Sequence, residues 1–261
     1  MLMAAWGTTF YFSWFSVVNN PTELNEMKKT LFFNFVSCSV YTVPVFFFCS
    51  GFLQTFSFLQ RDQEMNMFTC RNMSVYYFRK IFRYMPLNVI AMLFVLHGLP
   101  FLGSGPVWNY YDKLVAPCQN YWWTNILWIN NVYPREFDVK CLPWTWFVPT
   151  YIQLSLLLPP FIGMYKYIES KFFCGIIFFL IGVFGLLINF SFTYFSNYGA
   201  TIIMSEEFYA KVFMNPVYHF TSFFYGIAMS IVYIRFRKER GHVSAIKNSI
   251  SSRIIEMIRH N

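Results

Sequence analysis

The sequence predicts an all-α membrane protein: a polytopic bundle of about six transmembrane helices with one long loop outside the bilayer. Two observations lead to this fold class. Of the 261 residues, 56% are hydrophobic and only 12% are charged, whereas a soluble domain carries about twice that charge. Several apolar stretches are also long enough, or nearly so, to cross a hydrocarbon core, which needs about 20 helical residues. These stretches cover residues 1–18, 33–58, 84–102, 144–164, 172–191 and 212–234.

The distribution of basic residues predicts the orientation. If the tail after residue 234 is cytoplasmic, then the links 60–83 and 165–171 and the N-terminus are cytoplasmic too, and most Lys and Arg residues lie on that side. We therefore expect an integral protein of an endomembrane or the plasma membrane, with loop 103–143 in the lumen or exterior. The net charge of +8 is then a topology signal. The basic residues are not grouped as nucleic-acid binding requires.

Two cysteines of this loop, Cys118 and Cys141, are placed by this topology in an oxidising compartment. The other cysteines fall in or beside spans or in a cytoplasmic link. A disulfide between Cys118 and Cys141 is the natural hypothesis. It would close a loop of about 24 residues and contribute about 3 kcal/mol. Two free thiols are the alternative.

Local patterns predict features of individual spans. Pro44 should kink the second span, and Ser50-Gly51 should allow a neighbouring helix to approach closely. The tail, 235–261, is predicted as a basic amphipathic helix on the inner leaflet, because its isoleucines recur every four residues; a solvated tail is the alternative. The stripe consists of Ile246, Ile250, Ile254 and Ile258.

Arg79, Lys80 and Arg83 lie on one helical arc just before the third apolar stretch. One interpretation is a membrane anchor whose long side chains reach the lipid head groups. The other is a site for a phosphate-bearing cytoplasmic donor, because a guanidinium offers a two-pronged fork to phosphate. Sequence alone leaves both open.

His219 lies in the last apolar stretch and is a functional candidate, since ionisable groups in a membrane are costly. A hydrogen-bonded packing role is at least as plausible, because no carboxylate accompanies it. We see no metal site and no phosphate-binding glycine loop.

The loop itself is rich in aromatic residues and asparagine. We expect Tyr121, Trp122, Trp123 and Trp128 to form an outer interfacial belt. The asparagines can satisfy buried backbone groups of an irregular segment.

Several stretches resemble the acyltransferase-3 membrane family, in its nose-resistant-to-fluoxetine-like branch. They are "GSGPVW" (103–108), "CQNYWWTNILWINN" (118–131), "CLPWTWFVPTYIQ" (141–153), "FFFCSGFL" (46–53), "KIFRYMPL" (80–87) and "NPVYHFTSFFYG" (215–226). The resemblance covers about residues 4–233. The matching residues in and beside the loop include Trp122, Trp123, Asn125, Asn130, Asn131, Trp144, Trp146 and Gln153.

This resemblance implies that an acyl group moves from a cytoplasmic thioester donor, such as acyl-CoA, to an acceptor hydroxyl. It implies a general-base His in the first span, donor binding by the basic residues Arg79, Lys80 and Arg83, and about ten helices. We accordingly divide the chain into a partial acyltransferase-3-like domain, 1–234, and the tail 235–261.

The departures from the family pattern concern charged groups. Thr8 stands where the family has its His, Tyr151 where it has an Asp, and His219 where it has an Arg. Thr has no useful basicity at neutral pH, and loss of a general base typically lowers the rate 10²–10⁴-fold. The scaffold motifs remain while the acid–base groups are largely replaced.

Two functions therefore stay open. One is an O-acyltransferase-like protein with impaired or lost catalysis, a pseudoenzyme in the limiting case, using acyl-CoA as donor substrate and no bound cofactor. The other is a non-catalytic protein that binds or transports lipids or other hydrophobic molecules, or a structural subunit. In either case we expect the lipid bilayer as a partner, and a further chain that completes the bundle.

Overall fold

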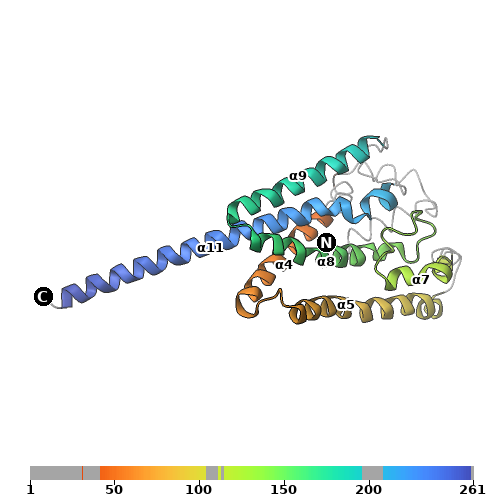
Figure 1. The fold of residues 1–261 in the computed structure, drawn as a ribbon. Helices are drawn as coiled ribbons and strands as arrows, with labels where there is room; N and C mark the ends of the chain where they lie inside the picture. Colours follow the sequence, from red (N-terminus) through yellow and green to blue (C-terminus); the bar gives the residue numbers. More distant parts are fainter. Residues whose placement is uncertain (1–30, 32–41, 104–110, 113–114, 196–207, 260–261) are drawn as a thin grey trace.

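The structure is a computed structural model that describes residues 31, 42–103, 111–112, 115–195 and 208–259. Within these residues every regular element is helical (Figure 1). The elements are α4 (Val43–Met65), α5 (Cys70–Leu93), η3 (Phe94–Gly98), η4 (Leu99–Phe101), α7 (Cys118–Ile126), η5 (Pro143–Trp146), α8 (Phe147–Tyr167), α9 (Lys171–Phe195), η6 (Tyr209–Phe213) and α11 (Pro216–Arg259).

Five helices in the described part of the chain are long and apolar enough to cross a membrane, which confirms the predicted fold class. They are Val43–Met65, Cys70–Phe101, Pro143–Tyr167, Phe172–Phe195 and Pro216–Lys238. The first predicted span, 1–18, lies outside the described residues, as does the start of the second.

The link predicted over residues 60–83 is much shorter than expected. Helix α4 continues to Met65 and α5 begins at Cys70, so only a tight turn separates them. Asn66 adopts a left-handed conformation, with φ of 45°, and its N–H donates to the carbonyl of Asp62 at 3.2 Å. The Asp62 carboxylate accepts from the N–H of Met67 at 2.7 Å and pairs with Lys166 of α8 at 3.0 Å. Asp62 and Asn66 thus stabilise the turn, and most of the predicted link is helical, as parts of α4 and α5.

Pro44 lies in the first turn of α4, where proline is tolerated because that N–H has no helical partner. The kink predicted at Pro44 thus falls at the start of the described helix, which begins at Val43. The part of the predicted second span before residue 42 lies outside the described residues.

Helices α4 and α11 touch through their backbones. A Cβ on Gly51 would lie 2.2 Å from the carbonyl oxygen of Phe223, and one on Gly226 would lie 2.1 Å from that of Phe48. No side chain fits at such distances. This confirms the expectation that Ser50-Gly51 permits close approach, and small residues are what allow helices to associate in lipid.

Helix α11 occupies the centre of the bundle, with α4, α8 and α9 packed around it (Figure 1). The shared core is largely aromatic. Its fully buried members include Phe47, Phe178, Phe213, Phe223 and Phe224.

Helix α5 lies at the edge of the bundle, against α8 and α7. Met92 is the one residue of α5 that is buried, whereas α11 buries Phe223, Phe224, Ile227 and Ile231 among others. Most of α5 is therefore left uncovered by the described part of the chain, which does not include the first predicted span.

Beyond the bundle, α11 continues as helix to Arg259 and extends well past the other helices (Figure 1). The backbone of the tail is thus helical and in line with the last span. Its placement on the inner leaflet stays a prediction and would require a bend after the span.

Replacing Gly226 with alanine should separate α4 from α11, because the added methyl group meets backbone atoms that cannot rotate away. We expect a loss of about 1–3 kcal/mol in the free energy of unfolding, measured by thermal unfolding in detergent. Gly175→Ala is the matched control, since its Cβ would meet only the methyl groups of Ile231 and Val232 at 3.9 Å. Equal stability of the two variants would contradict the backbone contact.

Candidate functional site

A polar cluster lies between α4, α5 and α8 and is centred on Lys80. The Lys80 Nζ donates to Gln54 Oε1 at 2.8 Å and to the Tyr151 hydroxyl at 3.2 Å. The Tyr84 hydroxyl lies 3.4 Å from that of Tyr151. The ammonium also lies 5.2 Å from the centre of the Tyr151 ring, within the range of a cation–π contact. Three helices thus converge on one amine.

Both hydrogen-bond acceptors of Lys80 are neutral oxygens. The sequence contains no Asp or Glu between residues 65 and 111 or between 139 and 168, so α8 and the part of α5 around Lys80 supply no carboxylate. The amide nitrogen of Gln54 is buried and has no hydrogen-bond partner among the described residues. The cluster can therefore accept an anion or hydrogen-bond a polarised carbonyl.

Arg79 and Arg83, predicted with Lys80 as donor contacts, lie on the exposed surface of α5. A helix turns by about 100° per residue, so the two arginines, four apart, share a face. Lys80 turns toward Tyr151 instead. The structure thus separates the three basic residues into one inward and two outward side chains.

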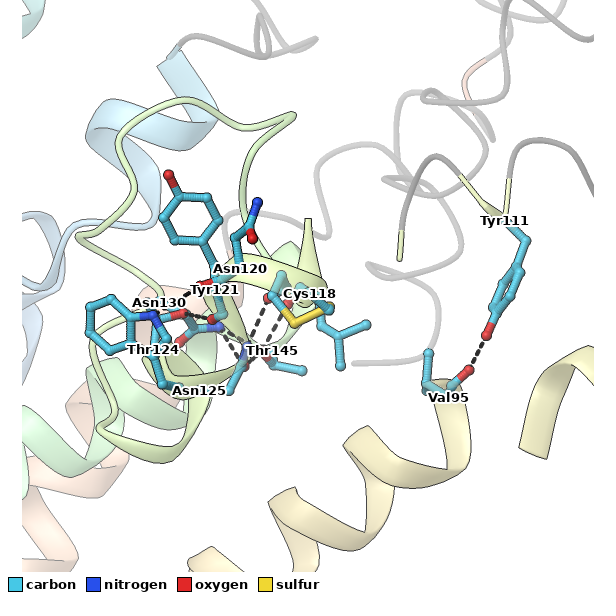
Figure 2. The surroundings of a disulfide bond; sticks show 12 residues. Val95, Tyr111, Cys118, Asn120, Tyr121, Thr124, Asn125, Asn130 and Thr145 are labelled. Atoms are coloured by element: carbon cyan, nitrogen blue, oxygen red, sulfur yellow. Dashed lines mark hydrogen bonds between the residues drawn. A yellow bond between two sulfur atoms is a disulfide. The ribbon is translucent and has the colours of Figure 1, made fainter. Parts of the chain in front are cut away.

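The segment 115–146, which we call the cap, joins α5 to α8 and contains the predicted disulfide. Cys118 of α7 and Cys141 form the bond, and both are buried (Figure 2). The side-chain amide of Asn125 donates to the carbonyl of Cys141 at 2.9 Å. This is the role expected for asparagine in an irregular buried segment.

Asn125, Asn130 and Thr145 form a closed hydrogen-bonded group beside the disulfide (Figure 2). The Asn125 Oδ1 accepts from Asn130 at 2.9 Å and from the Thr145 hydroxyl at 2.7 Å. Thr145 precedes α8, so this group joins the disulfide to the start of that helix.

A second pair joins the cap to α8 directly. The amides of Asn131 and Gln153 donate to each other's oxygens at 2.9 and 3.0 Å. Asn131 also donates to the Thr150 hydroxyl at 3.0 Å, and Gln153 to the carbonyl of Trp128 at 2.6 Å. Gln153 is two residues from Tyr151, so the same turn of α8 contacts the cap and the Lys80 cluster.

Lys140 is a buried cation that the sequence reasoning missed. Its side chain is 1% exposed, and its Nζ donates to the carbonyls of Asn130 (3.1 Å), Asn131 (3.4 Å) and Pro134. Burial lowers the pKa of Lys140 from its usual 10.5 to about 8. The signal available in the sequence was a single lysine directly before a cysteine of the predicted disulfide.

The tryptophans of the loop do not form one belt. Trp122 is exposed, whereas Trp128 is buried, with a left-handed backbone at φ of 59°. Placing Trp128 in an interfacial belt was therefore wrong: its backbone carbonyl is held by Gln153. Trp144 packs against the cluster around the disulfide, and Trp146 belongs to the main core.

His219 is completely buried between two aromatic rings. Its ring stacks on Phe47 at 4.4 Å and on Trp146 at 5.3 Å. Nε2 lies 2.8 Å from the carbonyl of Phe213, so Nε2 carries the hydrogen, and Nδ1 has no hydrogen-bond partner among the described residues. This environment favours the packing role. Thr8 lies outside the described residues.

The fold and the cap define a class: a polytopic helical membrane protein with a disulfide-linked, asparagine-rich cap joined to one of its spans. The chain belongs to the acyltransferase-3 family, whose acyltransferase domain it matches over residues 2–247.

A curated relative is similar over part of the chain. "Nose resistant to fluoxetine protein 6" of Caenorhabditis elegans is 27% identical over a match of 165 residues that covers 59% of this chain. The matched region is 20% of that relative's length, so the chain spans about a fifth of it. No solved structure matches this chain.

The buried Lys140 predicts an unusual dependence of stability on pH. As pH rises through about 8 the folded protein loses a proton that the unfolded chain keeps to about 10.5. The unfolded state then binds more protons, so stability should rise across this window, by at most about 3 kcal/mol. We expect thermal unfolding between pH 8 and 10 to show this rise in the native protein relative to Lys140→Met.

Arg135→Met is the control, because it removes an exposed cation from the same cap. A Lys140→Met variant with the same pH dependence as the native protein would contradict the lowered pKa. It would mean that the three carbonyls stabilise the ammonium as strongly as burial opposes it.

Proposed function

We propose that the protein is an acyltransferase-like membrane protein that binds a cytoplasmic acyl-thioester donor at the Lys80 cluster and has impaired or lost catalysis. One observation carries the proposal: an amine held at the junction of three helices, whose hydrogen-bond partners among the described residues are neutral oxygens. Since no carboxylate in the described part of the chain neutralises it, this cation is available to the phosphates or the thioester carbonyl of acyl-CoA.

Charge-assisted hydrogen bonds are about twice as strong as neutral ones, so a donor anion would compete well against Gln54 and Tyr151. Family membership supports acyl transfer as the chemistry from which this site derives. Tyr151, at the position where the resemblance implies Asp, lies directly against Lys80. The position at which the Tyr151 phenol replaces the carboxylate implied by the resemblance thus lies in the Lys80 cluster.

The proposed loss of catalysis concerns the general base. An acceptor hydroxyl must lose its proton as it attacks the thioester, and a base titrating near neutral pH assists this step. Thr8 cannot do so. Because Nε2 of His219 carries the hydrogen, only Nδ1 could accept a proton, and the ring is completely buried against Phe47 and Trp146, away from any acceptor substrate.

A second function is favoured by the exposed apolar length of α5. A non-catalytic protein that binds or transports a lipid, or a subunit that packs against a further chain, would use such a surface. In this alternative the Lys80 cluster is a structural junction.

The test uses the purified protein in nanodiscs, titrated with palmitoyl-CoA and with its non-hydrolysable thioether analogue. We expect Lys80→Gln to weaken binding of the analogue about 10-fold or more, because a charge-assisted contact worth about 1.5–3 kcal/mol is lost. Lys166→Gln, which removes a cation paired with Asp62 at the end of α8, should leave binding unchanged.

Unchanged binding in Lys80→Gln, or no binding by the native protein, would exclude the donor site and favour the second function. Release of free CoA from palmitoyl-CoA by the native protein, in excess over the buffer rate, would show instead that catalysis persists.

A further inference from the structure

The outward pair on α5, Arg79 and Arg83, is not used by the Lys80 cluster. Both side chains are exposed, and they are neighbours on the helix because they are four residues apart. The structure assigns Arg83 a contact with the ring of its neighbour Tyr84, at 5.6 Å. Neither arginine has an acidic partner in the described part of the chain, and the sequence places no Asp or Glu between residues 65 and 111.

This arrangement is unfavourable without a ligand. Two like charges four residues apart destabilise a helix by repulsion, and no acidic residue that the structure describes neutralises them. Two adjacent guanidinium forks can bind one phosphate with several charge-assisted hydrogen bonds. A bound phosphate would convert the repulsion into attraction.

The same face of α5 is apolar beyond the arginines. Leu87, Ile90 and Phe94 follow on the same face, and all three are exposed. From Arg83 to Phe94 the helix rises by about 16 Å, about half the thickness of a hydrocarbon core. The candidate phosphate site thus adjoins an apolar strip whose length along the helix is close to the depth of one lipid leaflet.

The position of the arginines along the helix also fits a membrane boundary. From Arg83 to the end of η4 at Phe101 the helix rises by about 27 Å, close to the whole hydrocarbon thickness of about 30 Å. The arginines then lie at the level of lipid phosphates, and the strip lies in hydrocarbon.

We propose that Arg79 and Arg83 form a binding site for the phosphodiester of an anionic membrane lipid, whose acyl chains lie along Leu87, Ile90 and Phe94. The site is separate from the Lys80 cluster, since it lies on the exposed face of α5. It goes beyond the proposed donor site and does not depend on it.

The experiment is native mass spectrometry of the full chain with dioleoyl phosphatidylserine and dioleoyl phosphatidylcholine in competition. Each arginine near an anionic lipid surface contributes about a factor of five in affinity. The double variant Arg79→Gln with Arg83→Gln should therefore reduce the preference for phosphatidylserine over phosphatidylcholine about 10- to 30-fold. The control is Arg71→Gln with Arg135→Gln, which removes the same charge from exposed positions outside the proposed site, one in the first turn of α5 and one in the cap. It should keep the preference.

A parallel titration with the thioether analogue of palmitoyl-CoA separates this site from the donor site. The Arg79 and Arg83 double variant should bind the analogue normally, and Lys80→Gln should keep its lipid preference. Loss of analogue binding in the double variant would return the arginines to the donor site and overturn the proposal. An unchanged lipid preference, or an equal loss in the Arg71 and Arg135 control, would overturn it as well.

If the double glutamine variant fails to fold, Arg79→Lys with Arg83→Lys keeps both charges but removes the forks. Its phosphatidylserine preference should fall several-fold. An unchanged preference would show attraction by charge alone and would contradict a defined phosphate site.

Discussion

The arrangement of the bundle depends on the backbone contact between α4 and α11. Lipid chains are as apolar as leucine, so transmembrane helices associate through close packing and hydrogen bonds, with no hydrophobic force between them. Gly51 and Gly226 provide the packing, because each faces a carbonyl of the other helix. With these two helices in contact, Phe47 of α4 reaches His219 and Phe147, and the aromatic core of α8, α9 and α11 closes around it.

The cap follows a different principle, since its backbone is irregular and must find partners away from water. Side-chain amides and one buried ammonium supply them. Asn125 holds the carbonyl of Cys141, Gln153 holds that of Trp128, and Lys140 holds three further carbonyls. The disulfide and these contacts make the cap an extension of α8. Asn125, Asn131 and Gln153 thus have a structural role in this chain, because they hold the cap together and join it to α8.

The sequence was sufficient to predict the fold class and the later spans, because the length of an apolar stretch can be counted directly. It also predicted the glycine contact, from the small residues Ser50 and Gly51, and the disulfide, from the compartment in which the topology places both cysteines. The division of Arg79, Lys80 and Arg83 could not be predicted, since which side of α5 faces the bundle depends on α8. Lys140 was missed because three carbonyls become its partners only when the chain folds back on itself. The burial of Trp128 depends in the same way on Gln153, 25 residues away.

Helix α11 also has a mechanical consequence. It begins at Pro216, two residues after Met214, whose carbonyl lies 3.4 Å from the Thr150 hydroxyl next to the cap. It then runs for 44 residues without interruption, or about 66 Å. Packing on α4 and α9 holds this helix at least as far as Arg237, which lies over the ring of Phe56. From Arg237 to Arg259 the same helix continues for about 33 Å. Because the helix is uninterrupted, a tilt of its packed part would swing its far end through an arc of about 33 Å radius. A small rearrangement among α4, α9 and α11 would thus be amplified in the tail.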